Sequence, residues 1–140
     1  MSRFLLDTDT LTLLQRGHAV VTTRVNAQAA TDVNLSAITI QEQTEGWLNA
    51  VARARTPQQT ELASRLLVDI PWPGWIRFAV LPFVVAATQR FDQLRALRLN
   101  VGLMDLRIAA VALVNGLTVV TRNQRDFGRV PTLATVDWSI

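Results

Sequence analysis

The sequence predicts an α/β domain whose central parallel sheet is covered by helices on both faces. The apolar runs are short and continuous rather than alternating, which is typical of strands buried on both sides. Stretches with helical spacing separate most of these runs along the chain, and this order favours parallel strands joined by helical crossovers. The length of 140 residues fits one domain, which we place at 1–140.

The first half of the chain predicts two strands and four helices. Gly17 ends the first helix, and Pro57 fits the first turn of the fourth. The segment Pro71-Trp72-Pro73-Gly74 breaks regular structure after it. We expect strands at 3–7 and 33–38, and helices from the caps at 8–10 to Gly17, at 19–30, at 39–54, and from Pro57 with the apolar stripe Leu62, Leu66, Leu67 and Ile70.

The second half continues the alternation of strands and helices. Asn115-Gly116 is a strong helix stop, because glycine readily adopts the left-handed conformation that ends a helix. A polar loop or single turn is expected at 122–128. The remaining elements are strands at 79–82, 117–121 and 133–136, and helices at 84–99 and 105–114.

Composition excludes several kinds of site. The chain has no cysteine and one histidine, His18, so disulfides, thiolate sites and a multi-histidine zinc site are impossible. All 14 basic residues are arginine and the net charge is +3, which permits RNA binding without demonstrating it. The longest apolar run, 78–87, is too short to cross a bilayer. No secretion signal is visible, so we expect a cytoplasmic protein without membrane association.

Four acidic residues occupy equivalent places in the predicted fold. Asp7 ends the first strand, and Glu42 is expected in the first turn of the helix after the second strand. Asp126 lies just past the strand at 117–121, and Asp105 opens an apolar helix. In open parallel sheets ligands bind at the carboxyl ends of the strands, so we expect these carboxylates to meet there.

Clustered carboxylates raise one another's pKa unless a cation lies among them. A site with oxygen ligands alone points to Mg²⁺ or Mn²⁺ rather than zinc or copper. Such an ion activates water and binds phosphate oxygens, so phosphodiester hydrolysis is the natural chemistry. The spacing suggests this site without being specific to it.

Four segments resemble motifs of one family. They follow the family's order and span nearly the whole chain, and together they are fairly specific. They are Leu5-Leu6-Asp7-Thr8-Asp9-Thr10, Ser36-Ala37-Ile38-Thr39-Ile40-Gln41-Glu42 with Gly46 after it, Asp105-Leu106-Arg107-Ile108-Ala109-Ala110-Val111-Ala112, and Thr118-Val119-Val120-Thr121-Arg122-Asn123-Gln124-Arg125-Asp126-Phe127. By these motifs the chain is similar to PIN-domain proteins, specifically the VapC-type toxins of bacterial type II toxin–antitoxin systems.

This resemblance implies a fold, an activity and partners. The fold is a PIN-like three-layer α/β/α sandwich, and the activity is Mg²⁺- or Mn²⁺-dependent cleavage of an RNA substrate. A cognate antitoxin and a homodimer are implied as partners. The family's acids carry over to Asp7, Glu42, Asp105 and Asp126, which would be both catalytic residues and metal ligands.

Three further residues are candidates for support of the site. Thr121 and Asn123 match positions that usually hold the acids by hydrogen bonds. Asp9 departs from the family pattern, which more often has asparagine or serine there, so its carboxylate either joins the metal shell or caps the helix. The number of metal ions stays open for that reason.

Each acid also has a purely structural interpretation. Asp7 could be a helix cap, although residues 8–10 already supply caps, and Glu42 could complete a capping box with Thr39. Asp105 would be favoured at a helix start by the macrodipole, and Asp126 could form a turn. His18 is interpreted as a surface or C-terminal cap residue. The tryptophans are interpreted as core or interface anchors: Trp47, Trp72, Trp75 and Trp138.

Two alternatives to the ribonuclease stay open. The first is a catalytically silent PIN-like module that binds RNA or a protein. The second is another phosphoryl-transfer enzyme, either a 5′-nuclease or an aspartyl phosphatase that would use Asp7 and Asp9. The segment Asp7-Thr8-Asp9-Thr10-Leu11 fits the phosphatase pattern only partly, and the chain has no lysine to clamp a phosphate.

Overall fold

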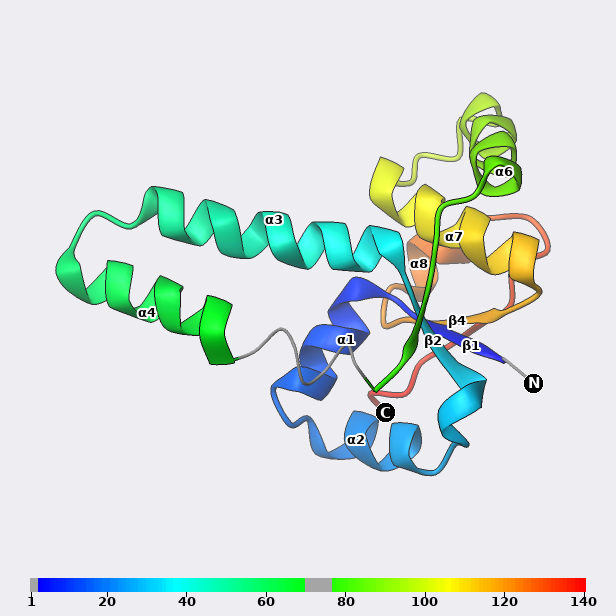
Figure 1. Ribbon diagram of the computed structural model, residues 1–140. Coiled ribbons are helices and arrows are strands. Elements are labelled where there is room, and N and C mark those ends of the chain that lie inside the picture. Colours follow the sequence, from blue (N-terminus) through cyan, green and yellow to red (C-terminus); the bar gives the residue numbers. More distant parts are fainter. Residues whose placement is uncertain (1–2, 70–76) are drawn as a thin grey trace.

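The computed structural model describes residues 3–69 and 77–140, and it contains a five-stranded sheet in which every pairing is parallel (Figure 1). The strand order is β3-β2-β1-β4-β5. Leu5 of β1 pairs with Asn34 on one side and Val119 on the other, which sets the register of the three central strands. The strands are β1 (Phe4–Leu6), β2 (Val33–Ser36), β3 (Ala79–Leu81), β4 (Thr118–Val120) and β5 (Thr135–Val136).

Helices lie on both faces of this sheet, so the predicted α/β/α sandwich is confirmed. Successive strand residues point to opposite faces. Leu5 and Val119 therefore pack with α6 and α7, whereas Leu6 and Val120 pack with α1 and α2. The helices are α1 (Thr8–Gln15), α2 (Ala19–Asn26), α3 (Ala37–Arg53), α4 (Pro57–Asp69), α6 (Val85–Ala96), α7 (Leu103–Asn115) and α8 (Gln124–Phe127), with the 3₁₀ turn η1 (Ala30–Asp32) before β2.

The boundary between β2 and α3 differs from the prediction. The expected strand 33–38 ends at Ser36, and α3 begins at Ala37 instead of Thr39. Ser36 has an extended backbone, and its hydroxyl accepts a hydrogen bond from the Thr39 amide at 3.2 Å. Since Ser36 is the N-cap, Thr39 is not, and the capping-box interpretation of Glu42 is wrong. Glu42 lies in the second turn of α3 rather than the first.

Two other caps also differ from the prediction. Asp7 itself caps α1 through the Thr10 amide, so residues 8–10 are not the caps. His18 caps the start of α2 instead of the end of α1, because its Nδ1 accepts a hydrogen bond from the Val21 amide at 3.3 Å.

Several expected element ends move by a few residues. The helix expected at 19–30 ends at Asn26 and is followed by η1, and the helix expected at 84–99 covers 85–96. The helix expected at 105–114 begins earlier, at Leu103, and ends where Gly116 adopts φ +65°. Ile70, the breaker at 71–74, and the tryptophans at 72 and 75 lie outside the described residues.

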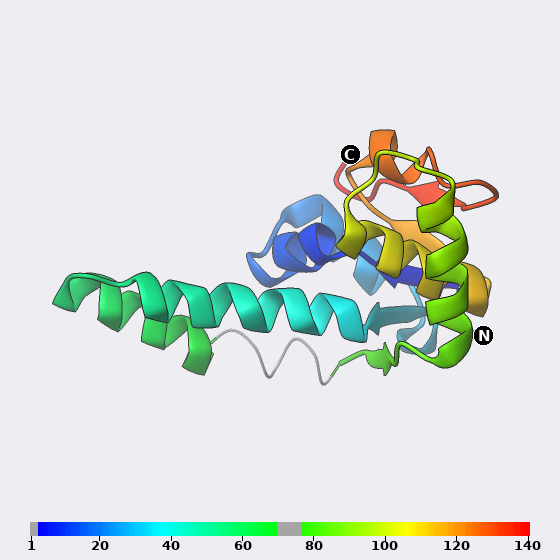
Figure 2. The same ribbon diagram turned by 90° about the horizontal axis from the view of Figure 1, so that it is seen from above.

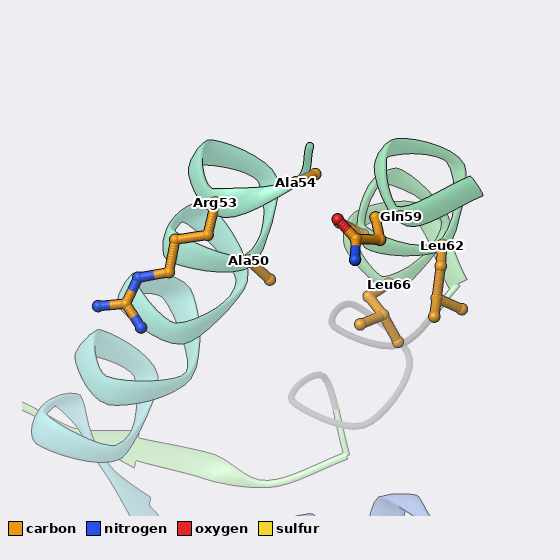
Figure 3. A pocket seen from close by; sticks show the side chains of 7 residues that line it. Ala50, Arg53, Ala54, Gln59, Leu62 and Leu66 are labelled. Carbon is orange, nitrogen blue, oxygen red and sulfur yellow. The ribbon is translucent and has the colours of Figure 1, made fainter. Parts of the chain in front are cut away.

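The α3–α4 pair projects away from the sheet as an antiparallel hairpin (Figures 1 and 2). The helices enclose a hollow of about 250 Å³, which Figure 3 shows from close by. Its lining is mostly apolar and comes from both helices: Ala50, Arg53, Ala54, Gln59, Leu62, Ala63 and Leu66. Among the helices in residues 3–69 and 77–140, none combines the length and hydropathy needed to span a bilayer.

Candidate functional site

Asp7 lies at the carboxyl end of β1, the central strand of the sheet. Its side chain is 4% exposed, and Oδ1 accepts a hydrogen bond from the Thr10 amide at 2.8 Å. Burial raises the pKa of Asp7 above its usual value, hydrogen bonds from the Thr121 and Thr10 side chains oppose that rise, and the charge of Asp9 adds to it.

Asp105 sits in the first turn of α7 and faces the same edge of the sheet. Its pKa is raised to about 6, first by burial and then by four negative charges. Those charges belong to Asp7, Glu42, Asp9 and Asp126, in descending order of effect. The fold therefore brings all four predicted acids, together with Asp9, into electrostatic contact around Asp105.

Glu42 reaches the cluster from α3 and is held by α1. The Thr8 hydroxyl donates a hydrogen bond to Glu42 Oε1 at 2.6 Å. The same hydroxyl lies 3.1 Å from Thr39 Oγ1, one turn before Glu42 on α3. A carboxylate oriented by a hydroxyl keeps its second oxygen available for another ligand.

Asp126 enters from the single-turn helix α8. Asn123 caps this helix: its Oδ1 accepts from the Asp126 amide at 3.4 Å, and its Nδ2 donates to Asp126 Oδ2 at 3.0 Å. Arg129 forms a partly exposed ion pair with Asp126 Oδ1 at 3.4 Å. The loop acid is thus held on both oxygens.

Thr121 connects two parts of the site. It is fully buried at the end of β4, its side chain hydrogen-bonds to Asp7, and its Oγ1 accepts from the Asn123 amide at 2.9 Å. Thr121 therefore links the carboxylate on β1 to the loop that carries Asp126. The structure places Asp9, by contrast, on the exposed side of α1, where it acts on Asp7 and Asp105 through charge.

The donor set suits a hard divalent cation. The acidic side chains near this edge offer carboxylate oxygens, which are the ligands that Mg²⁺ and Mn²⁺ prefer. The negative charges of the neighbouring carboxylates contribute to the raised pKa of Asp105. A bound cation would relieve the repulsion between these carboxylates. Within residues 3–69 and 77–140, no three acidic or histidine side chains converge closely enough to form a ready-made metal cluster.

No family model matches the sequence, and no curated protein matches it either. Solved structures do match. The chain is 27% identical to a chain of the DNA-bound VapBC crystal structure from Salmonella typhimurium, with 99% of each chain covered and a TM-score of 0.79. It is 26% identical to a chain of FitAcB from Neisseria gonorrhoeae, with 96% of each covered and a TM-score of 0.72.

A third match is VapBC-1 from nontypeable Haemophilus influenzae, at 24% identity, 98% of each chain and a TM-score of 0.69. The chain resembles VapC-type PIN-domain proteins in its sequence motifs and in its fold. The resemblance predicted from the four sequence motifs is therefore confirmed, and the fold extends over essentially the full length of the matched chains.

Two hollows flank the acids of this PIN-like domain. One, of about 340 Å³, lies between α1, α3 and α4 and includes Glu42 in its wall. The other, of about 310 Å³, includes Asp9 and Asn123. Thr12 and Arg16 of the α1 end line both, so one guanidinium stands between the two approaches to the acidic edge.

Sequence reasoning missed two residues of the PIN site. Thr8 was interpreted only as a cap, although it holds Glu42. Its place directly after Asp7, at the start of a helix that crosses α3, was the available signal. Arg129 was not singled out, because its pairing with Asp126 depends on how the chain continues after the α8 turn.

Proposed function

We propose that this VapC-type chain is the toxin of a toxin–antitoxin pair and cleaves RNA as an Mg²⁺- or Mn²⁺-dependent endoribonuclease. The observation that carries the proposal is the gathering of Asp7, Glu42 and Asp126 around Asp105, whose pKa they raise together with burial and Asp9. The Salmonella and Haemophilus structures are VapBC complexes, and VapBC is a family of toxin–antitoxin systems. We propose an antitoxin and a second copy of the chain as its partners.

The four carboxylates would hold the cation. When bound, Mg²⁺ or Mn²⁺ supplies an activated water and stabilises negative charge on the phosphate. Thr121 and Thr10 keep Asp7 oriented, Thr8 does the same for Glu42, and Asn123 for Asp126. Because these donors come from three different elements, the protein fixes the directions of its carboxylates before a substrate arrives.

The proposal is tested with purified protein freed of antitoxin and incubated with total cellular RNA. We expect cleavage with Mg²⁺ or Mn²⁺ and none with EDTA. Binding of RNA without cleavage in any metal would favour the silent module instead. Turnover of p-nitrophenyl phosphate, or of DNA from a free 5′ end, in place of RNA would favour the other phosphoryl-transfer enzymes.

A further inference from the structure

The hollow beside Asp9 is lined by more positive than negative side chains, although it lies next to the acidic cluster. Its lining is Asp9, Thr12, Leu13, Arg16, Arg122 and Asn123, around a volume of about 310 Å³. Two guanidinium groups therefore face one carboxylate. The hollow carries net positive charge although it directly adjoins the most acidic part of the molecule.

Both arginines are available to a ligand. Arg16 ends α1 and Arg122 follows Thr121 at the end of β4, and both residues are exposed. In the part of the chain that the structure describes, neither forms an ion pair. Asp137 feels the charge of Arg122, but its Oδ1 accepts two hydrogen bonds from Ser139 instead, at 2.8 and 2.6 Å.

Two other arginines, Arg129 and Arg24, are already engaged. Arg129 pairs with Asp126 and also donates to the Asn100 carbonyl at 2.8 Å. Arg24 donates to the Ile140 carbonyl at 2.6 Å. Arg16 and Arg122 therefore share one hollow, and among residues 3–69 and 77–140 neither guanidinium group has an ion-pair partner.

A strand of RNA meets a repulsive field at the clustered carboxylates, because every nucleotide carries a negative phosphate. Cations close to the cleavage site are needed to hold the strand against that field. Guanidinium groups suit the task, since their fixed fork of donors binds two phosphate oxygens at once. Asn123 connects the hollow to the acidic site. It lines the hollow, and its side chain donates a hydrogen bond to Asp126.

We propose that Arg16 and Arg122 together bind a backbone phosphate of the RNA strand next to the bond that is cleaved. This assignment rests on the proposed ribonuclease function, and it makes the two arginines positioning residues. Thr12 and Asn123 complete the polar wall of the subsite, and Asp9, whose charge acts on Asp7 and Asp105, lines the same hollow.

The test measures RNA binding in EDTA, where no cleavage occurs. A 5′-fluorescein single-stranded RNA oligonucleotide of mixed sequence is titrated with wild type, with the double variant Arg16→Gln/Arg122→Gln, and with Arg90→Gln. Arg90 is an exposed arginine on α6 and serves as the matched control. Fluorescence anisotropy is followed at several salt concentrations, and thermal melts verify that each variant is folded.

We expect the double variant to bind several-fold more weakly at low salt. The slope of log affinity against log salt should fall in magnitude by about 0.7, because the two arginines bind one phosphate and each phosphate contact of a single strand contributes about 0.7. Arg90→Gln should keep the wild-type slope. With Mn²⁺ present, the double variant should raise KM for RNA cleavage more than it lowers kcat.

An unchanged slope in the double variant would overturn the subsite, whether or not wild type cleaves RNA. So would a wild type that binds no RNA at any salt. A reduced slope in a protein that never cleaves RNA would keep the subsite and remove the ribonuclease proposal. Wild type and the double variant are also compared for binding of an oligoglutamate peptide. If the double variant loses peptide binding but binds RNA like wild type, the arginines bind an acidic protein segment, and the proposal is overturned.

Discussion

Asp105→Asn is expected to lower the rate of RNA cleavage at least about a hundredfold, since loss of even an indirect partner of a metal ligand costs about 10–100-fold. Asparagine has nearly the shape of aspartate, so the change removes charge without leaving a cavity. The assay is cleavage of total RNA in Mn²⁺. Asp92→Asn, which changes an exposed aspartate on α6, is the matched control and should cleave like wild type.

The Asp105→Asn variant should stay folded, as judged by circular dichroism. Wild-type rates in Asp105→Asn would remove this residue from the site. Equal loss of activity in Asp92→Asn would show that the assay reports a general effect of charge instead of the acidic edge.

The second large effect concerns stability without metal. In EDTA, the folded state should lose stability as the pH rises from about 4 to about 6, relative to Asp105→Asn. The pKa of Asp105 is raised from 3.8 to about 6 in the folded chain, so in this window the native state binds more protons than the unfolded state. By linkage, stability then falls with rising pH and stays low above pH 6.

The size of the stability loss follows from the shift in the pKa of Asp105. The full shift corresponds to about 3 kcal/mol, and about half of it survives for a partly exposed group screened by solvent. At pH 7 in EDTA, Asp105→Asn should therefore melt about 2–6 °C above wild type, and the two should converge below pH 4. A wild type that melts above the variant at pH 7 in EDTA would contradict the electrostatic account of the site.

Most of the fold could be predicted because its signals are local. The strands β1 and β4 are continuous apolar runs, and their alternate residues fill both cores, as Leu5 and Leu6 do. Gly116 ends α7 at the expected place because the left-handed backbone there favours glycine. The start of α3 could not be placed, because Ser36 and Thr39 are both good caps in sequence. The tertiary position of β2 decides between them.

Some residues of the site could likewise be predicted from the sequence, and others could not. Asp7, Glu42, Asp105 and Asp126 could be named because each stands at an element end that a parallel sheet brings to one edge. Of their partners, Thr121 and Asn123 could be named from the family resemblance. Thr8 could not, since its contact with Glu42 spans 34 residues and depends on how α1 crosses α3. Arg16 and Arg122 share a hollow for a similar reason: one ends a helix and the other follows a strand 106 residues later in the sequence.

The central claim is that these carboxylates form one divalent-cation site, and direct titration tests it without RNA. Mn²⁺ is titrated calorimetrically at pH 7 into metal-free wild type, Asp105→Asn and Asp92→Asn. We expect saturable binding of one or two ions by wild type and Asp92→Asn, and loss of that binding in Asp105→Asn. Equal binding by all three proteins, or no binding by wild type, would contradict the claim.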